Sequence, residues 1–130
     1  MSATAAVLRG RKAAESLMLD QCTITRPGEV VTDPETGDVT NTSIEVYSGK
    51  CKVQSKDSAT ATPEAGEHQF TVVSRQVHIP ANAADVRDGD VVTLTASALN
   101  AFTVGKQYRV AGFTPDTFDT AFRLPVKEVL

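Results

Sequence analysis

The alternation of apolar and polar side chains predicts a chain built mostly of short β-strands. From Cys22 onward apolar residues recur at every second position, which places them on one face of a strand. Stretches rich in Pro, Gly and Asp interrupt this alternation and indicate turns. We expect strands within residues 22–26, 30–32, 39–40, 49–54, 69–79, 91–95, 108–113 and 121–129. About six to eight short strands favour a small antiparallel β-barrel or sandwich, because both arrangements shield strand edges.

The first 18 residues have the composition and spacing of a helix. Ala-rich segments favour a helix over 4–18, and Ser2 or Thr4 is suited to cap its start. Its apolar stripe is narrow, and the remaining faces carry basic side chains. We therefore predict a helical arm (1–18) that packs mainly on another subunit, attached to a β domain (19–130). The proposed interface residues are Val7, Arg9, Arg11 and Lys12.

Turn chemistry predicts the connections between strands. The segment 33–38 (DPETGD) has Pro early and Gly late and indicates a hairpin between 30–32 and 39–40. Arg26-Pro27-Gly28 is expected to end the first strand, and Asp88-Gly89-Asp90 to form a tight turn. The change of apolar face near Val73 suggests a bulge. Residues 99–103 suggest one helical turn.

Residues 57–67 (DSATATPEAGE) contain no large apolar side chain and predict one long loop. Loops of this length in compact domains are usually functional or disordered. Ordering the backbone costs roughly 1–2 kcal/mol per residue, so we expect this segment to be mobile until it meets a partner. The residues proposed for a partner or channel contact are Lys56, Asp57, Glu64, Glu67 and His68.

Composition and charge exclude several classes of protein. Apolar residues make up 41% and charged residues 22%, as in globular domains. The 13 Lys and Arg are outnumbered by 16 Asp and Glu, which gives a net charge of -3 and disfavours broad nucleic-acid binding. No apolar run approaches the ~20 residues of a membrane helix, and there is no signal-peptide core. We expect a cytoplasmic protein with no membrane association.

The sequence carries no recognisable catalytic, cofactor or metal motif, so we predict a binding or structural role without enzymatic activity. Cys22 and Cys51 are in phase with apolar neighbours and are expected to be reduced, inward-facing strand residues. A metal site of both cysteines and one His is the alternative. We interpret His68 and His78 as surface residues. The acidic cluster of Asp85, Asp88 and Asp90 is typical of a turn rather than of a calcium site.

The order of six segments resembles a known family, although each is only a turn or strand pattern. The segments are LDQCTITR (19–26), DPETGDVT (33–40), YSGKCKVQ (47–54), VRDGDVVTLTAS (86–97), VGKQYRVAGF (104–113) and TAFRLPVKEV (120–129). In this order they resemble small head-to-tail connector proteins of actinobacterial phages and prophages, of the stopper or head-completion kind.

The resemblance implies a structural virion protein at the head–tail interface, assembled in the host cytoplasm. It would form a closed ring of this chain, of six or twelve copies, between portal or adaptor proteins and tail-terminator or tail-tube proteins. Genomic DNA would pass through the channel without specific binding, and in some relatives a long loop helps to retain it. The alternatives are a tail-terminator or minor tail subunit, or a small nucleic-acid-binding β-barrel.

Overall fold

The computed structural model describes residues 2–61 and 70–129. One helix, α1 (Ala3–Ser16), precedes six strands. The strands are β1 (Asp20–Thr32), β2 (Val39–Ala61), β3 (Phe70–Pro80), β4 (Val91–Ser97), β5 (Gln107–Val110) and β6 (Ala121–Val129). A short 3-10 helix, η1 (Ala101–Thr103), lies between β4 and β5 and matches the helical turn expected there. The prediction of a mainly β fold with an N-terminal helix is confirmed.

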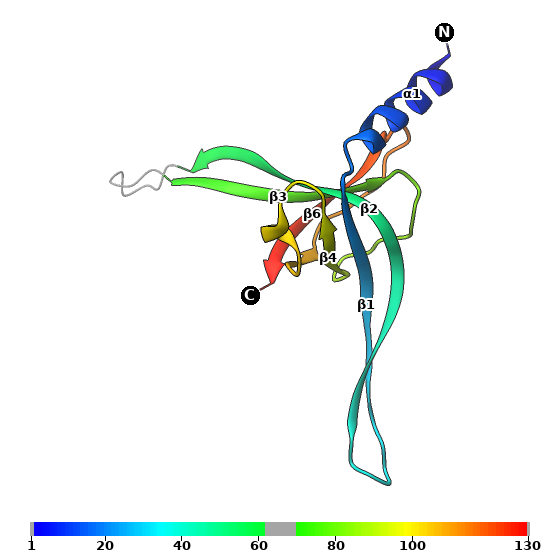
Figure 1. Cartoon of the computed structure of the whole chain (residues 1–130), viewed down its shortest axis with the longest axis vertical. Coiled ribbons are helices and arrows are strands. Elements are labelled where there is room, and N and C mark those ends of the chain that lie inside the picture. Colours follow the sequence, from blue (N-terminus) through cyan, green and yellow to red (C-terminus); the bar gives the residue numbers. More distant parts are fainter. Residues whose placement is uncertain (1, 62–69, 130) are drawn as a thin grey trace.

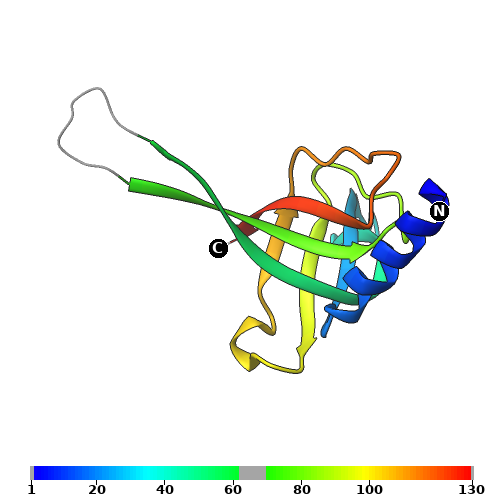
Figure 2. The ribbon, with the colours of Figure 1, turned by 90° about the horizontal axis from the view of Figure 1, so that it is seen from above.

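The six strands close into one antiparallel barrel with the order β1-β2-β3-β6-β5-β4. Closure comes from the pairing of β1 with β4, in which Cys22 lies opposite Leu94 and Ile24 opposite Val92. Helix α1 lies across the outside of the barrel, as Figure 2 shows. Each of the six strands therefore has two neighbours in the barrel, an arrangement that shields strand edges.

The core fills the barrel with side chains that alternate along each strand. Tyr108 and Val110 of β5 are buried while Gln107 and Arg109, which alternate with them, are exposed, and β1 has the same alternation at Cys22 and Ile24. Burial of each aliphatic side chain stabilises the fold by roughly 1.5–3 kcal/mol. The largest fully buried apolar residues are Tyr108, Ile24, Ile79, Leu94, Leu124, Val77, Val92 and Val110.

Strand β1 continues through Pro27 and Gly28, so the prediction that it ends there is wrong. A register shift between Pro27 and Val30 places a bulge on β1, which accommodates a proline that cannot donate to the ladder. Gly28 is needed because a Cβ there would lie 2.6 Å from the carbonyl oxygen of Thr42. Beyond the bulge the strands pair as far as Thr32 and Val39, which confirms the predicted hairpin. In its turn, Gly37 has a φ of 72°.

Strand β2 also runs further than expected, so the loop predicted over 57–67 is wrong for its first five residues. Asp57 pairs with Val73 and Ala61 with Phe70, and together β2 and β3 form a hairpin that extends sideways from the barrel (Figure 1). The extra residue in the register lies on β2, between Asp57 and Thr60, close to the bulge expected near Val73. Residues 62–69 lie outside the described part of the chain.

Helix α1 begins at Ala3, with the Ser2 hydroxyl accepting from the amide of Ala5, as predicted for this cap. It contacts its own barrel, which the sequence did not lead us to expect. A Cβ on Gly10 would lie 2.7 Å from the methyl group of Thr120, so the missing side chain permits close approach to the barrel. Arg11 Nε donates to the carbonyl of Asp119 at 3.1 Å, and Glu15 forms an ion pair with Lys50 at 3.0 Å.

Candidate assembly surfaces

Residues 27–45 project from the barrel as a two-stranded extension of β1 and β2, here called the β1–β2 arm (Figure 1). Its apolar side chains are exposed: Val30 by 61%, Val31 by 51%, Val39 by 64% and Ile44 by 62%. The register places Val30 and Val39 on one face and Val31 and Ile44 on the other. Apolar residues on both faces are typical of a strand pair that is covered on both sides.

The β1–β2 arm is also the most acidic part of the chain. Between positions 27 and 45 there are five carboxylates and no Lys or Arg. The carboxylates are Glu29, Asp33, Glu35, Asp38 and Glu45. The arm therefore combines exposed apolar surface with a single sign of charge, which favours a partner that is both apolar and basic.

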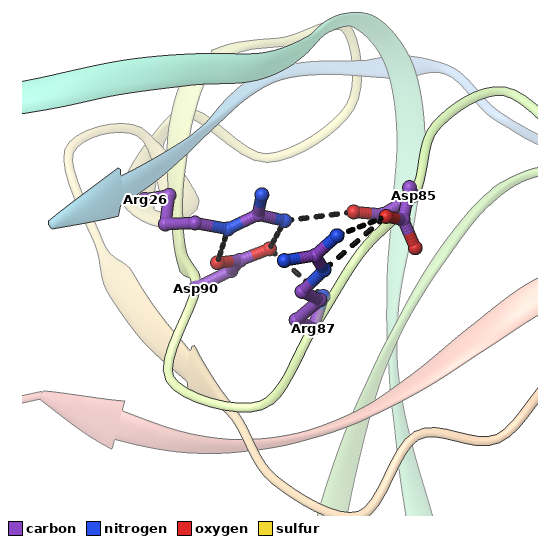
Figure 3. Close-up of polar contacts among 4 residues, drawn as sticks. All are labelled: Arg26, Asp85, Arg87 and Asp90. Atoms are coloured by element: carbon purple, nitrogen blue, oxygen red, sulfur yellow. Dashed lines mark hydrogen bonds and ion pairs between the residues drawn. The ribbon is translucent and has the colours of Figure 1, made fainter.

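The base of the arm is fastened to the barrel by a nearly buried carboxylate, as Figure 3 shows. Arg26 Nε and Nη2 donate to the two oxygens of Asp90 at 3.0 and 3.1 Å, and Nη2 also donates to the carbonyl of Asp85 at 2.8 Å. The hydrogen bond to Asp90 raises the pKa of Arg26. The backbone amide of Arg87 donates to Asp90 at 2.9 Å. Both oxygens of Asp90 therefore have partners within the cluster, and Asp88 and Gly89 form the turn that the sequence predicted.

A second surface, here called the η1 groove, lies where the end of α1 approaches β2 and the β4–β5 connection. Its cavity has a volume of about 500 Å3. Phe102 is 90% exposed and Leu99 82% exposed, and Leu17 and Leu19 add further exposed apolar surface from the end of α1. The side chain of Asn100 caps η1 by accepting from the amide of Phe102, which holds this apolar corner in place.

The η1 groove carries basic side chains among its apolar ones. Lys52, Arg75 and Lys106 line it, and Lys106 is paired with Glu128 at 2.9 Å. Asp20 is the single acid among the described lining residues, and its carboxylate accepts from Ser97 Oγ at 2.7 Å. The groove is therefore complementary in both charge and polarity to the β1–β2 arm.

Comparison with known protein families gives one match. A model described as "Family of unknown function (DUF6093)" matches residues 10–127. The chain belongs to this family. No curated protein and no solved structure matches the DUF6093 chain. In the described residues, none of the helical structure is long and apolar enough to span a membrane.

A row of three basic side chains crosses the outer face of the DUF6093 barrel beside α1. Lys52 of β2 lies opposite His78 of β3, and His78 lies opposite Arg123 of β6. Val77 and Ile79 point into the core, so the alternation turns His78 outward, where neighbouring groups nevertheless leave it only 7% exposed. The interpretation of His78 as a surface residue is therefore wrong. Burial, followed by the charges of Lys52 and Arg123, lowers the pKa of His78 to about 4.

The two cysteines are core residues, as predicted. Cys22 and Cys51 are both free and at most 1% exposed. The hydrogen bond between Cys51 and Cys22, together with burial, raises the pKa of the Cys51 thiol. Within residues 2–61 and 70–129, no cluster of three His, Cys, Asp or Glu is arranged to hold a metal ion.

Among the described residues, those proposed for the helical interface and those proposed for the channel loop lie on different elements. In α1, Val7 and Arg11 are half-buried, while Arg9 and Lys12 are exposed. Lys56 and Asp57 lie on β2, whereas Glu64, Glu67 and His68 lie outside the described residues. Neither the β1–β2 arm nor the η1 groove was identified from the sequence as a candidate surface. The cluster of acids around Val30, Val31 and Val39 was the signal available for the arm.

Proposed function

We propose that this DUF6093 protein is a structural subunit of a phage head-to-tail connector, of the stopper or head-completion kind. In this role, copies of the chain form a ring between the portal or adaptor and the tail. The ring helps to retain packaged DNA and provides the surface on which the tail docks. Genomic DNA passes through without being recognised by sequence.

The exposed apolar β1–β2 arm is the observation that supports this proposal most directly. The barrel has its own buried core, yet Val30, Val31, Val39 and Ile44 remain uncovered on a projecting extension. Large apolar side chains gathered on both faces of a projecting element are typical of surfaces that bind a partner. An obligate assembly in which neighbouring subunits cover the arm accounts for these exposed side chains. The resemblance of the six segments, in their order, to phage connector proteins favours a connector ring as that assembly.

The charge of the chain is compatible with a DNA channel. A net charge of -3 gives a subunit that does not accumulate phosphate contacts over its whole surface. Such a ring lets DNA slide during packaging and ejection, whereas a strongly basic bore would hold it. DNA retention then depends on obstruction of the channel rather than on affinity.

Deletion of the gene from the phage that carries it tests the proposal. We expect heads that package DNA but lose it, together with free tails of normal length, in electron micrographs of the lysate. A plasmid copy of the wild-type chain should restore joined particles. A matched copy carrying Asp116→Lys, a charge reversal at an exposed position outside the arm and the groove, should restore them equally.

Three other outcomes would contradict the connector assignment. Tails of irregular length on the deletion would indicate a tail terminator, and missing distal tail structures would indicate a minor tail subunit. Normal virions would exclude a role in the particle altogether. Salt-dependent binding of DNA by the purified chain, together with normal virions, would favour the nucleic-acid-binding alternative.

A further inference from the structure

We propose that the β1–β2 arm of one copy docks in the η1 groove of a neighbouring copy of the same chain. The inference rests on the proposed function, because a ring requires one contact that every subunit makes with the next. It goes beyond that function by naming the two surfaces that meet.

The arm and the groove belong to different parts of the same subunit. The arm extends away from the barrel in the direction of β1 (Figure 1), whereas η1 belongs to the connection between β4 and β5. The arm is also held at its base by the contacts of Arg26 with Asp90 and Asp85. It is therefore presented outward, where it can reach the groove of another copy.

Both surfaces expose apolar side chains that a partner would remove from water. The arm presents Val31 and Ile44 on one face, and the groove presents Leu99 and Phe102. Removing these groups from water on both sides of the contact supplies its main driving force. The second apolar face of the arm, with Val30 and Val39, is then available to the barrel of the neighbour or to a third subunit.

Charge selects this pairing over a contact between two arms or two grooves. The five carboxylates of the arm would repel those of a second arm, and Lys52 and Arg75 would repel their equivalents in a second groove. Opposed potentials across the arm–groove contact remove both penalties and fix the orientation of the partners. The acidic arm is equally unsuited to phosphate, so a nucleic acid does not compete for this role.

Two different surfaces that bind each other make a heterologous contact. Each copy offers one arm and one groove, so the contact repeats head to tail and produces a ring when the rotation between neighbours closes. The contacts of Arg26 with Asp90 and Asp85 fix the arm at its base, so that every pair of neighbours has the same rotation. Preorganisation of this kind also lowers the ordering cost of association.

Charge reversal in the purified full chain tests the contact. The arm variant carries Glu29→Lys and Glu35→Lys, the groove variant carries Lys52→Glu and Arg75→Glu, and Asp116→Lys is the control. Native mass spectrometry and light scattering over a range of concentrations measure the oligomer. We expect each double variant alone to weaken assembly by about tenfold or more, and the control to leave it unchanged.

Mixing the two variants is the decisive step. In the mixture, the unchanged acidic arm of the groove variant can bind the unchanged basic groove of the arm variant. At the next contact, the arm that carries the new lysines faces the groove that carries the new glutamates. We expect rings with alternating copies to form from the mixture and neither variant to form them alone. Circular dichroism of each variant establishes that the barrel remains folded.

The outcomes for the contact and for the proposed function are separate. If the arm variant and the groove variant each still form rings like those of the wild-type chain, the arm–groove contact is overturned. The connector assignment is unaffected by that result. A wild-type chain that stays monomeric at every concentration would overturn the contact as well, and the gene-deletion experiment would still decide the function. Cross-links from the arm to a different virion protein would likewise overturn docking between copies.

Discussion

His78 shows how a single residue acquires a property that its place in the sequence does not suggest. Its ring lies on the outer face of β3 beside α1, with Lys52 and Arg123 directly opposite on the neighbouring strands. Gln76 Oε1 lies 3.3 Å from its Nε2. Protonation would place a third positive charge in this row, in a position shielded from water, and the neutral ring is therefore favoured.

We predict that the protein loses stability as the pH falls from about 6.5 to about 4. In the unfolded chain His78 binds a proton near its ordinary pKa of 6.5, whereas in the fold its pKa is about 4. The unfolded state therefore binds more protons in this window, and the free energy of unfolding decreases by on the order of 2–3 kcal/mol. Urea unfolding at a series of pH values measures the loss.

Two variants make this pH prediction specific. His78→Gln should remove the part of the pH dependence that arises between 6.5 and 4. Arg123→Gln should raise the pKa of His78, because it removes one of the two charges that lower it. An NMR titration that places the His78 pKa near 6.5 in the wild-type fold would contradict the argument.

At the scale of elements, α1 depends on a glycine that is unfavourable for the helix itself. Gly10 costs about 1 kcal/mol relative to Ala in a helix interior. It is tolerated because the helix approaches the barrel so closely that a Cβ would lie 2.7 Å from the Thr120 methyl group. The contact of α1 with its own barrel thus overrides local helix propensity.

Gly10→Ala is therefore predicted to loosen α1 from the barrel even though it favours the helix. Amide hydrogen exchange in α1 should become faster, by several-fold or more, while exchange in β6 stays unchanged. Adding Thr120→Ser should restore protection, since serine removes the clashing methyl group and keeps the hydroxyl that accepts from Arg123. Slower exchange in Gly10→Ala alone would show that the space at this contact is greater than the geometry indicates.

At the scale of the whole molecule, the barrel and the β1–β2 arm have separate roles. The arm contains no buried side chain among its described residues, whereas Leu124 and Ile24 in the barrel are completely buried. Folding stability is therefore concentrated in the barrel. The arm contributes surface, and its exposed valines have no role in the core.

Shortening the arm is accordingly expected to leave the fold intact. Replacing residues 28–42 with Asn-Gly joins Pro27 to Ser43 through a two-residue turn. The free energy of unfolding should change by no more than about 1 kcal/mol, because no buried apolar surface is lost. Leu124→Ala, as the contrasting variant, should cost about 2–5 kcal/mol. Thermal and urea unfolding compare the two, and an unfolded arm-deletion variant would show that the arm belongs to the folding unit.

The alternation of side chains by itself determined which segments are strands and which residues fill the barrel. Cys22 and Cys51 were recognisable as inward-facing residues because the pleat of a strand is a local property with a period of two. The Gly37 and Gly89 turns were recognisable for a related reason, since a positive φ depends on the residue at that position. Most of the core, and the cap at Ser2, could be predicted in this way.

Only the tertiary structure decided the features that depend on strands far apart in the sequence. Pairing with β2 carries β1 past Pro27, and pairing with β3 carries β2 to Ala61, because a ladder continues wherever a partner strand is present. Arg26 and Asp90 are separated by 64 positions and meet only after closure. The burial of His78 and the meeting of Leu17 with Phe102 in one groove have the same cause. The burial of a side chain and the charge around it depend on which elements pack together. The alternation of apolar and polar residues along one strand does not determine which elements become neighbours.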